Sequence, residues 1–146
     1  MRTLILILIT LLAAPAFAQD NAKDTPGTGP IRVLFVGNSY TSFNNLPGIV
    51  QSLAVSARQK RPIEYDMVTP GGCTWERHFN DERIGTIEKI KSQKWDYVVM
   101  QEQSQMPFMY PDDARKFGVL LGKVVQEQGA TPILYMTWAR EKQPEM

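Results

Sequence analysis

The sequence predicts an α/β protein, with a three-layer α/β/α arrangement around a mostly parallel sheet. Short apolar segments of strand length alternate with longer segments that have helical periodicity. Successive strand-like segments begin about 30 to 36 residues apart, which leaves room for a helical crossover between parallel neighbours. Because such crossovers are right-handed, we expect helices on both faces of the sheet.

Four apolar segments predict the strands of this sheet. They cover residues 31–36, 63–69, 95–100 and 131–137. The chain ends nine residues after the fourth segment, with no further helical pattern. We therefore expect an incomplete domain, in which a fifth strand and a last helix are missing and part of one face of the fourth strand lacks cover.

Two segments between these strands predict amphipathic helices. Residues 46–60 follow Asn44 and Asn45, either of which can cap a helix, and Pro47 suits the first turn. Their expected buried face consists of Leu46, Ile49, Val50, Leu53, Ala54 and Ala57. Residues 111–128 begin with acidic residues and end before Gly129, and their expected buried face is Ala114, Phe117, Leu121, Val124 and Val125. Residues 73–93 are expected to be irregular and then helical, and 101–110 to form a loop.

The N-terminus predicts export. Residues 1–18 combine Arg2, a short apolar run and a small-residue stretch that ends at Ala18, which is typical of a cleaved secretory signal peptide. The apolar run is much shorter than the roughly 20 residues of a membrane-spanning helix. Residues 19–30 read as a flexible leader and 31–146 as one domain. We expect a secreted or periplasmic protein without a membrane anchor.

Composition excludes several classes of function. The chain has 16 Lys and Arg against 15 Asp and Glu, and Arg2 would leave with the signal peptide. A nearly neutral protein gives no electrostatic case for nucleic acid or an anionic membrane. One Cys and one His cannot form an intramolecular disulfide or a closed zinc site. We expect no metal and no cofactor.

The loops after the first three strands carry the candidate chemistry, because ligands bind at the carboxyl ends of the strands of open α/β sheets. Ser39 follows the first strand in the turn VGNSYT, where its hydroxyl can be exposed beside backbone N–H groups. The alternative is that Gly37, Asn38 and Ser39 only form a turn. The second and third loops contain GGCT and QEQS, which offer glycine N–H groups and side-chain amides.

These three motifs resemble those of the SGNH (GDSL-like) hydrolases, and the resemblance covers residues 31 to about 140. It implies a flavodoxin-like α/β/α fold and a serine ester hydrolase that acts without a cofactor on small-molecule or carbohydrate esters, such as acetylated sugars. Ser39 takes the place of the nucleophile. Gly72, two residues before Thr74, takes the place of the oxyanion-hole glycine, and Gln103 that of the oxyanion-hole amide.

The sequence departs from the family pattern at two points. Gln103 stands where the family usually has Asn. The family's C-terminal Asp-x-x-His motif, which supplies the general base and its orienting acid, is absent. Loss of a triad member removes most of the rate of such enzymes, so we expect this chain to be weak or inactive as it stands.

Four further residues are candidates for substrate binding: Asn38, His78, Glu102 and Trp138. His78 could replace the missing base, with Glu76, Asp81 or Glu82 as partner, or could orient the substrate or its loop. Glu102 could be a base, an ion-pair partner of Arg140 or a solvated loop acid. Cys73 is expected to be structural rather than nucleophilic.

The predicted loops also contain aromatic residues, and two other classes of function fit the same fold. Trp138, Phe108 and Tyr110 could line a substrate groove or only pack their loops. A non-catalytic carbohydrate-binding module on the same fold is the main alternative to a hydrolase. A flavodoxin-like binder of phosphate or nucleotide is a third, although the sequence lacks GxGxxG and GxxxxGK[ST] motifs.

Overall fold

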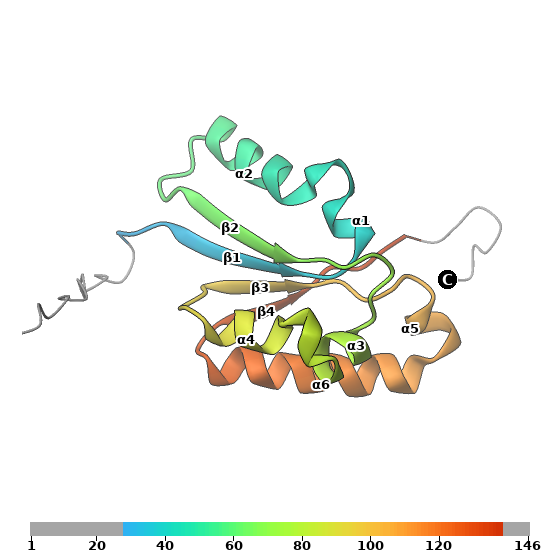
Figure 1. The fold of residues 1–146 in the computed structure, drawn as a ribbon. Coiled ribbons are helices and arrows are strands. Elements are labelled where there is room, and N and C mark those ends of the chain that lie inside the picture. The colour runs from blue at the N-terminus through green and yellow to red at the C-terminus, as the bar shows by residue number, and fades with distance from the viewer. Residues whose placement is uncertain (1–27, 139–146) are drawn as a thin grey trace, which may run out of the picture.

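The structure, a computed structural model, describes residues 28–138 and contains one parallel sheet (Figure 1). Its strands are β1 (Ile31–Val36), β2 (Ile63–Val68), β3 (Tyr97–Met100) and β4 (Thr131–Leu134). Their order is β2-β1-β3-β4, and all three pairings are parallel. The carboxyl ends of all four strands therefore face the same edge of the sheet. The expected signal peptide 1–18 and most of the leader lie outside the described residues.

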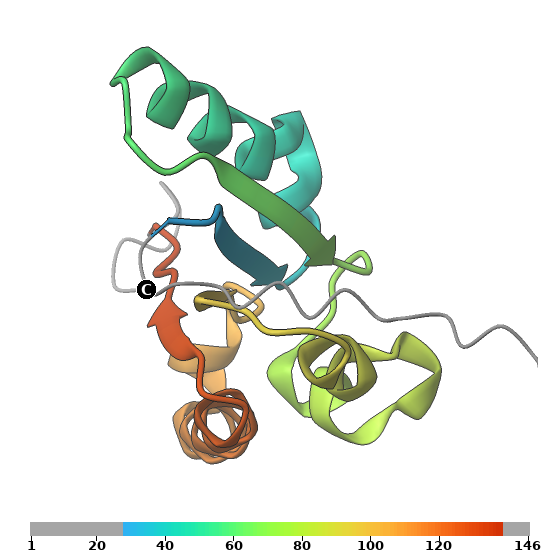
Figure 2. The ribbon, with the colours of Figure 1, turned by 90° about the vertical axis from the view of Figure 1, so that its left-hand side faces the viewer.

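Helices cover both faces of the sheet, as predicted (Figures 1 and 2). On one face lie α1 (Ser39–Ser42), a 3-10 turn (Phe43–Asn45) and α2 (Leu46–Ser56). On the other lie α3 (Trp75–Asn80), a 3-10 turn (Glu82–Ile84), α4 (Thr86–Lys91) and α6 (Pro111–Glu127), and the short α5 (Met106–Met109) precedes α6. The three-layer α/β/α prediction is confirmed.

The main hydrophobic core lies between the sheet and the layer of α3, α4 and α6. Strand residues alternate between the two faces, so Leu34 and Val36 of β1 enter this core, whereas Val33 and Phe35 face the α2 side. The core cluster consists of Leu34, Val36, Trp75, Ile90, Trp95, Val98, Met100, Phe117, Leu121, Val125 and Ala130.

Helix α6 follows the prediction closely. Ala114, Phe117, Leu121 and Val125 are buried at helical spacing, and Val124 is half-buried. The chain leaves the helix through Gly129, which has φ 76° and donates its N–H to the Gln126 carbonyl. A glycine fits this position because other residues rarely adopt a positive φ.

Several element boundaries differ from the prediction. β3 begins at Tyr97 because Trp95 leaves the strand line and buries its ring in the core, where its indole N–H donates to the Lys89 carbonyl. β4 ends at Leu134 rather than at residue 137. Helix α2 ends at Ser56, and Arg58 then adopts a left-handed conformation with φ 54°.

The predicted buried face of α2 is only partly correct. Ile49, Leu53 and Ala57 are exposed. The physical reason is placement, because α2 packs mainly against β2 and so leaves part of its apolar stripe without a partner. The faces of β3 and β4 on this side are also open, and an apolar groove runs beside α2 that is lined by Val33, Phe35, Leu46, Val50, Tyr97, Val99, Ile133, Leu134 and Tyr135. Ile133 and Leu134 of β4 are exposed among the described residues.

The described residues lack a membrane-spanning helix and a metal-binding group of side chains. No helix in residues 28–138 combines the length and the apolar character that a membrane crossing requires. The same residues contain no group of three or more His, Cys, Asp or Glu side chains that could hold a metal ion.

Leu121→Ala tests how much the packing of α6 on the main core contributes to stability. Leu121 is fully buried, so the substitution removes apolar contacts and leaves a cavity. We expect the free energy of unfolding, measured by urea denaturation, to fall by about 2–5 kcal/mol. Val119→Ala on the exposed side of the same helix should change it by less than about 0.5 kcal/mol. Equal effects of the two substitutions would contradict this packing.

Candidate active site

A sharp turn follows β1, and Gly37 is the residue that makes it possible. Its N–H donates to the Val68 carbonyl (3.0 Å), which ties the turn to the end of β2. A Cβ atom at Gly37 would lie 2.7 Å from Thr41 Oγ1 and 2.8 Å from Gln101 Oε1. The close approach of these polar side chains therefore requires glycine at this position.

Asn38 ties three loops together. Its side-chain oxygen caps α1 by accepting from the Tyr40 N–H (3.1 Å), and its Nδ2 donates to the Cys73 carbonyl (3.0 Å). Its backbone N–H donates to Gln101 Oε1 (3.1 Å). The side chain is only 3% exposed. Asn38 thus positions the turn, and its suggested role in substrate binding stays a prediction.

Gln101 is a central residue of this site that the sequence interpretation missed. It follows β3 directly, it is buried, and its N–H continues the ladder by donating to the Val36 carbonyl (2.8 Å). Its Oε1 accepts from the Asn38 N–H (3.1 Å) and from the Thr41 hydroxyl (3.0 Å), and its Nε2 donates to the Glu102 carbonyl. The end of β3 thus holds the turn after β1 through one amide.

His78 also holds the turn after β1, through the carbonyl of Gly37. It is 1% exposed, and its Nε2 lies 2.7 Å from the Gly37 carbonyl oxygen while its Nδ1 lies 2.7 Å from Thr86 Oγ1. A carbonyl oxygen can only accept, so Nε2 carries the proton and Nδ1 accepts from the Thr86 hydroxyl. None of the expected acidic partners of His78 makes this contact. The contacts that the structure describes for His78 are therefore with its loops, and its suggested role in substrate binding stays a prediction.

The protonation of His78 fits this structural position. Burial lowers its pKa, the hydrogen bond to the Gly37 carbonyl raises it, and the nearby Arg77 lowers it. The net shift is downward, so His78 stays neutral at physiological pH. Both ring nitrogens are occupied, and neither is available to take a proton from Ser39.

Ser39 lies on the surface above this buried framework. It is the first residue of α1, it is exposed, and its side chain makes no hydrogen bond to another residue of the described part of the chain. The residues on both sides of it are fixed, since Asn38 caps the helix and Thr41 bonds Gln101. The structure therefore presents a free hydroxyl on a rigid turn.

Gly72 occupies a tight turn in the loop after β2. The Cys73 N–H donates to the Pro70 carbonyl (3.1 Å), and Gly72 inside this turn has φ 64°. The residue is exposed, and no heavy atom lies within 4 Å of the position a Cβ would take. Its N–H has no backbone acceptor within residues 28–138, so it is free to donate to a ligand.

Gln103 is fixed by its own loop. Its Oε1 accepts from the Gln105 N–H (2.7 Å) and the Met106 N–H (3.2 Å), which sets the orientation of the amide. The Nε2 group has no hydrogen-bond partner in the described chain and remains a donor. Gln103 therefore retains the chemical capacity that the resemblance assigns to it.

Glu102 is buried rather than solvated. It is 5% exposed, and its Oε1 accepts from the Trp75 N–H (2.9 Å) and the Gln103 N–H (2.6 Å). Burial raises its pKa, the two backbone hydrogen bonds lower it, and the charge of Glu76 raises it, with a net upward shift. Glu102 thus joins the loops after β2 and β3. Its suggested partner Arg140 lies outside the described residues.

Cys73 is a structural residue in this arrangement. Its side chain is fully buried, and burial raises the pKa of its thiol. A protonated, inaccessible thiol is a poor nucleophile. Its carbonyl, which accepts from Asn38, is the part of the residue that serves the site.

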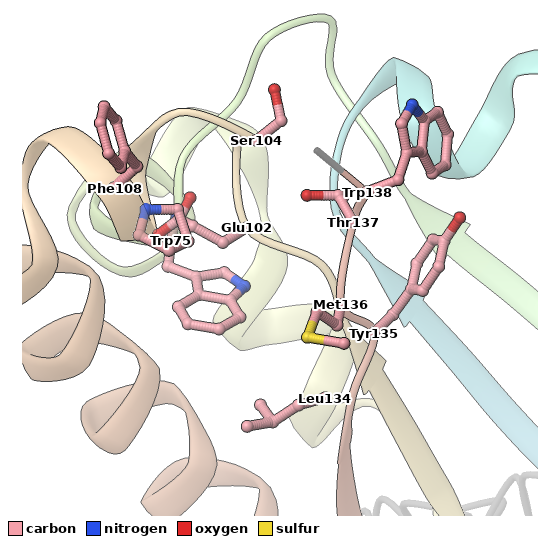
Figure 3. A pocket seen from close by; sticks show the side chains of 10 residues that line it. Trp75, Glu102, Ser104, Phe108, Leu134, Tyr135, Met136, Thr137 and Trp138 are labelled. Atoms are coloured by element: carbon pink, nitrogen blue, oxygen red, sulfur yellow. The ribbon is translucent and has the colours of Figure 1, made fainter. Parts of the chain in front are cut away.

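A pocket of about 480 Å³ opens beside these loops (Figure 3). It is lined by Trp75, Glu102, Ser104, Pro107, Phe108, Leu134, Tyr135, Met136, Thr137 and Trp138. Trp138 stacks on Tyr40, the residue after Ser39, with the ring centroids 5.1 Å apart and the planes nearly parallel. Through Trp138 the pocket thus reaches the turn that carries Ser39. Ser39, Gly72 and Gln103 are not among its lining residues, and neither is Tyr110.

Comparison with known proteins shows what this geometry resembles. No protein-family model and no curated protein matches the chain. A solved structure described as "a putative SGNH hydrolase from Slackia heliotrinireducens" is 29% identical, with a TM-score of 0.66 over 77% of this chain and 59% of that one. The resemblance to the SGNH hydrolases is confirmed.

A second solved structure shares the SGNH-like fold. It is a DUF4886 family protein from Bacteroides uniformis ATCC 8492, 21% identical, with a TM-score of 0.56 over 75% of this chain and 51% of that one. At this identity the likeness concerns the fold alone. The chain described here spans about three fifths and half of the lengths of the two neighbours.

The chain contains one His, so the pH dependence of its stability tests whether His78 is buried and neutral. As pH falls below about 6.5, the unfolded chain takes up a proton on His78, whereas the folded chain resists because burial lowers the pKa. The unfolded state then binds more protons, so we expect the free energy of unfolding to decrease between about pH 6.5 and 5, by at most about 1.4 kcal/mol per pH unit.

His78→Gln is the matched variant, because Gln can still donate to Gly37 and accept from Thr86 but does not titrate. Urea denaturation across this pH range should show a decrease in wild-type stability that the variant lacks. Glu102, whose pKa is raised, contributes with the opposite sign in both proteins and cancels in the comparison. The same pH profile in both proteins would contradict the buried neutral His78.

Proposed function

We propose that this protein is an exported serine ester hydrolase of SGNH type. Ser39 Oγ attacks the ester carbonyl carbon and loses its proton to a base, the bond to the alcohol breaks, and water then hydrolyses the acyl-serine. The Gly72 N–H and the Gln103 amide donate hydrogen bonds to the oxyanion of each tetrahedral intermediate. Export is proposed from the signal-peptide pattern of residues 1–18.

The observation that carries this proposal is the exposed hydroxyl of Ser39, which has no hydrogen-bond partner within residues 28–138 and lies on a turn fixed by buried hydrogen bonds. Fixed position matters because acyl transfer needs the nucleophile within a few tenths of an ångström of its productive geometry. Two donors without partners among the described residues, the N–H of Gly72 and the Nε2 of Gln103, belong to the neighbouring loops at the same edge of the sheet. A nucleophile and oxyanion donors are two of the components of acyl transfer, and a general base is the third.

The general base is the missing component of this mechanism. The sequence contains one His, and both of its ring nitrogens are already engaged. We therefore propose that the 146-residue chain is weak or inactive on its own. Loss of the base from a Ser-His-Asp triad lowers kcat by about 10⁴–10⁶-fold, and the remaining rate comes from the oxyanion hole and binding.

Acetylated carbohydrate is the substrate class that we propose. Trp138 is 59% exposed and stacks on Tyr40, immediately beside Ser39. An exposed aromatic face suits the C–H surface of a sugar ring. Removal of a small acyl group would leave the sugar side of the ester to contact such a surface.

Covalent labelling of Ser39 tests the nucleophile directly. We expect a fluorophosphonate to add one adduct at Ser39, seen by intact-mass and peptide mass spectrometry, and Ser39→Ala to abolish it. Ser42→Ala on the same short helix is the control and should label like the wild type, because Ser42 lies outside the proposed site. Unchanged labelling in Ser39→Ala would refute the proposal.

A non-catalytic carbohydrate-binding module is the second candidate, favoured by the engaged nitrogens of His78. It predicts that Ser39→Ala binds sugar esters as tightly as the wild type and that fluorophosphonate labels neither protein. The labelling experiment therefore separates the two functions.

A further inference from the structure

The pocket beside α5 contains a buried donor without a partner. Trp75 is 9% exposed, and its Nε1 makes no hydrogen bond to any described residue. Figure 3 shows the indole nitrogen turned into the pocket, toward Met136. A buried N–H without an acceptor is costly, so its presence at a pocket wall points to a ligand that supplies the acceptor.

The ring of Trp75 packs closely against α6. Its backbone N–H is held by Glu102 Oε1 (2.9 Å), and its ring lies against the helix at Gly118. A Cβ atom at Gly118 would lie 2.6 Å from Trp75 Cζ3, so this close approach requires glycine in the helix. Contacts at the backbone and at the ring therefore position the indole N–H.

The rest of the pocket restricts what can bind. Phe108, Leu134, Met136 and Trp138 give it largely apolar walls. Glu102 also lines it and accepts two backbone N–H groups through Oε1, while Oε2 has no hydrogen-bond partner in the described chain. A free carboxylate oxygen in such a pocket accepts from a ligand donor and repels a ligand anion.

We propose that this pocket binds an uncharged, partly apolar group that carries a carbonyl oxygen, with Trp75 Nε1 donating to that oxygen and Glu102 excluding anions. The site itself rests on the geometry of the pocket. That the bound group is part of an ester substrate rests on the proposed function, and Trp75 and Glu102 are then its specificity-determining residues.

Two small molecules of similar size test this site: acetanilide, which is neutral and has a carbonyl oxygen and an N–H, and phenylacetate, which is an anion. Both are titrated into the Ser39→Ala chain while the indole N–H signals of its three Trp residues are followed by NMR. The Trp75 signal is the one absent from Trp75→Phe. We expect acetanilide to shift it and phenylacetate to bind at least about tenfold more weakly.

Two substitutions assign the roles. Trp75→Phe keeps an aromatic ring, although a smaller one, and removes the N–H; it should weaken acetanilide binding by at least about fivefold, which corresponds to the loss of one neutral hydrogen bond. Glu102→Gln retains an acceptor for the two backbone N–H groups and should bring the affinity for phenylacetate close to that for acetanilide. Trp95→Phe is the control, because its indole donates to the Lys89 carbonyl in the main core; it should not alter acetanilide affinity.

Each other outcome overturns the inference. Absence of acetanilide binding, binding that leaves the Trp75 signal unmoved, or equal affinity for both molecules would each contradict it. The shift is read in a chain with Trp75 intact, so it does not depend on how well Trp75→Phe folds. Because binding is measured without Ser39, absence of fluorophosphonate labelling in the wild type with retained acetanilide binding refutes the hydrolase alone, and labelling of Ser39 without acetanilide binding refutes the pocket alone.

Discussion

The buried amide of Gln101 is the interaction on which the rest of the site depends. Its Oε1 accepts from the Asn38 N–H and the Thr41 hydroxyl, so one side chain after β3 fixes both sides of Ser39. Gly37 must lack a side chain to let this amide approach. Neutral polar groups inside a protein are costly unless they are paired, and here the pairing is what defines the turn.

The same logic joins the other loops to this turn. Asn38 holds the Cys73 carbonyl, Glu102 holds the first N–H of α3, and His78 connects the Gly37 carbonyl with α4. These bonds cross between segments far apart in sequence, so the loops of three strands form one rigid unit. The proposed ester hydrolysis needs such rigidity, because Ser39 and the proposed oxyanion donors Gly72 and Gln103 lie in different loops. As a consequence, we expect one substitution among these linked residues to disturb the loops after all three strands.

The fold and part of the site could be predicted from the sequence, each for a physical reason. Alternating apolar periods report burial, so the parallel sheet and α6 were predicted correctly. The turn around Ser39 could also be predicted, because it depends on residues that are adjacent in sequence. Burial of Gln101 and His78 depends on neighbours in space, and nothing local separates Gln101 from Gln103 two residues later. The position of Gln101, directly after a strand that pairs with β1, was the signal available. The exposure of Ile49, Leu53 and Ala57 in α2 was not predicted, because helical periodicity does not show how much of an apolar helix face packs against another element.

Native-state hydrogen exchange of the Asn38 amide tests the central claim, that the Gln101 side chain holds the turn after β1. Gln101→Met keeps the length of the side chain and removes its hydrogen bonds. We predict that the Asn38 N–H exchanges at least about tenfold faster in this variant, beyond any change at the Leu121 amide in the core of α6, which reports global stability. Equal protection of Asn38 in both proteins, after this correction, would contradict the account.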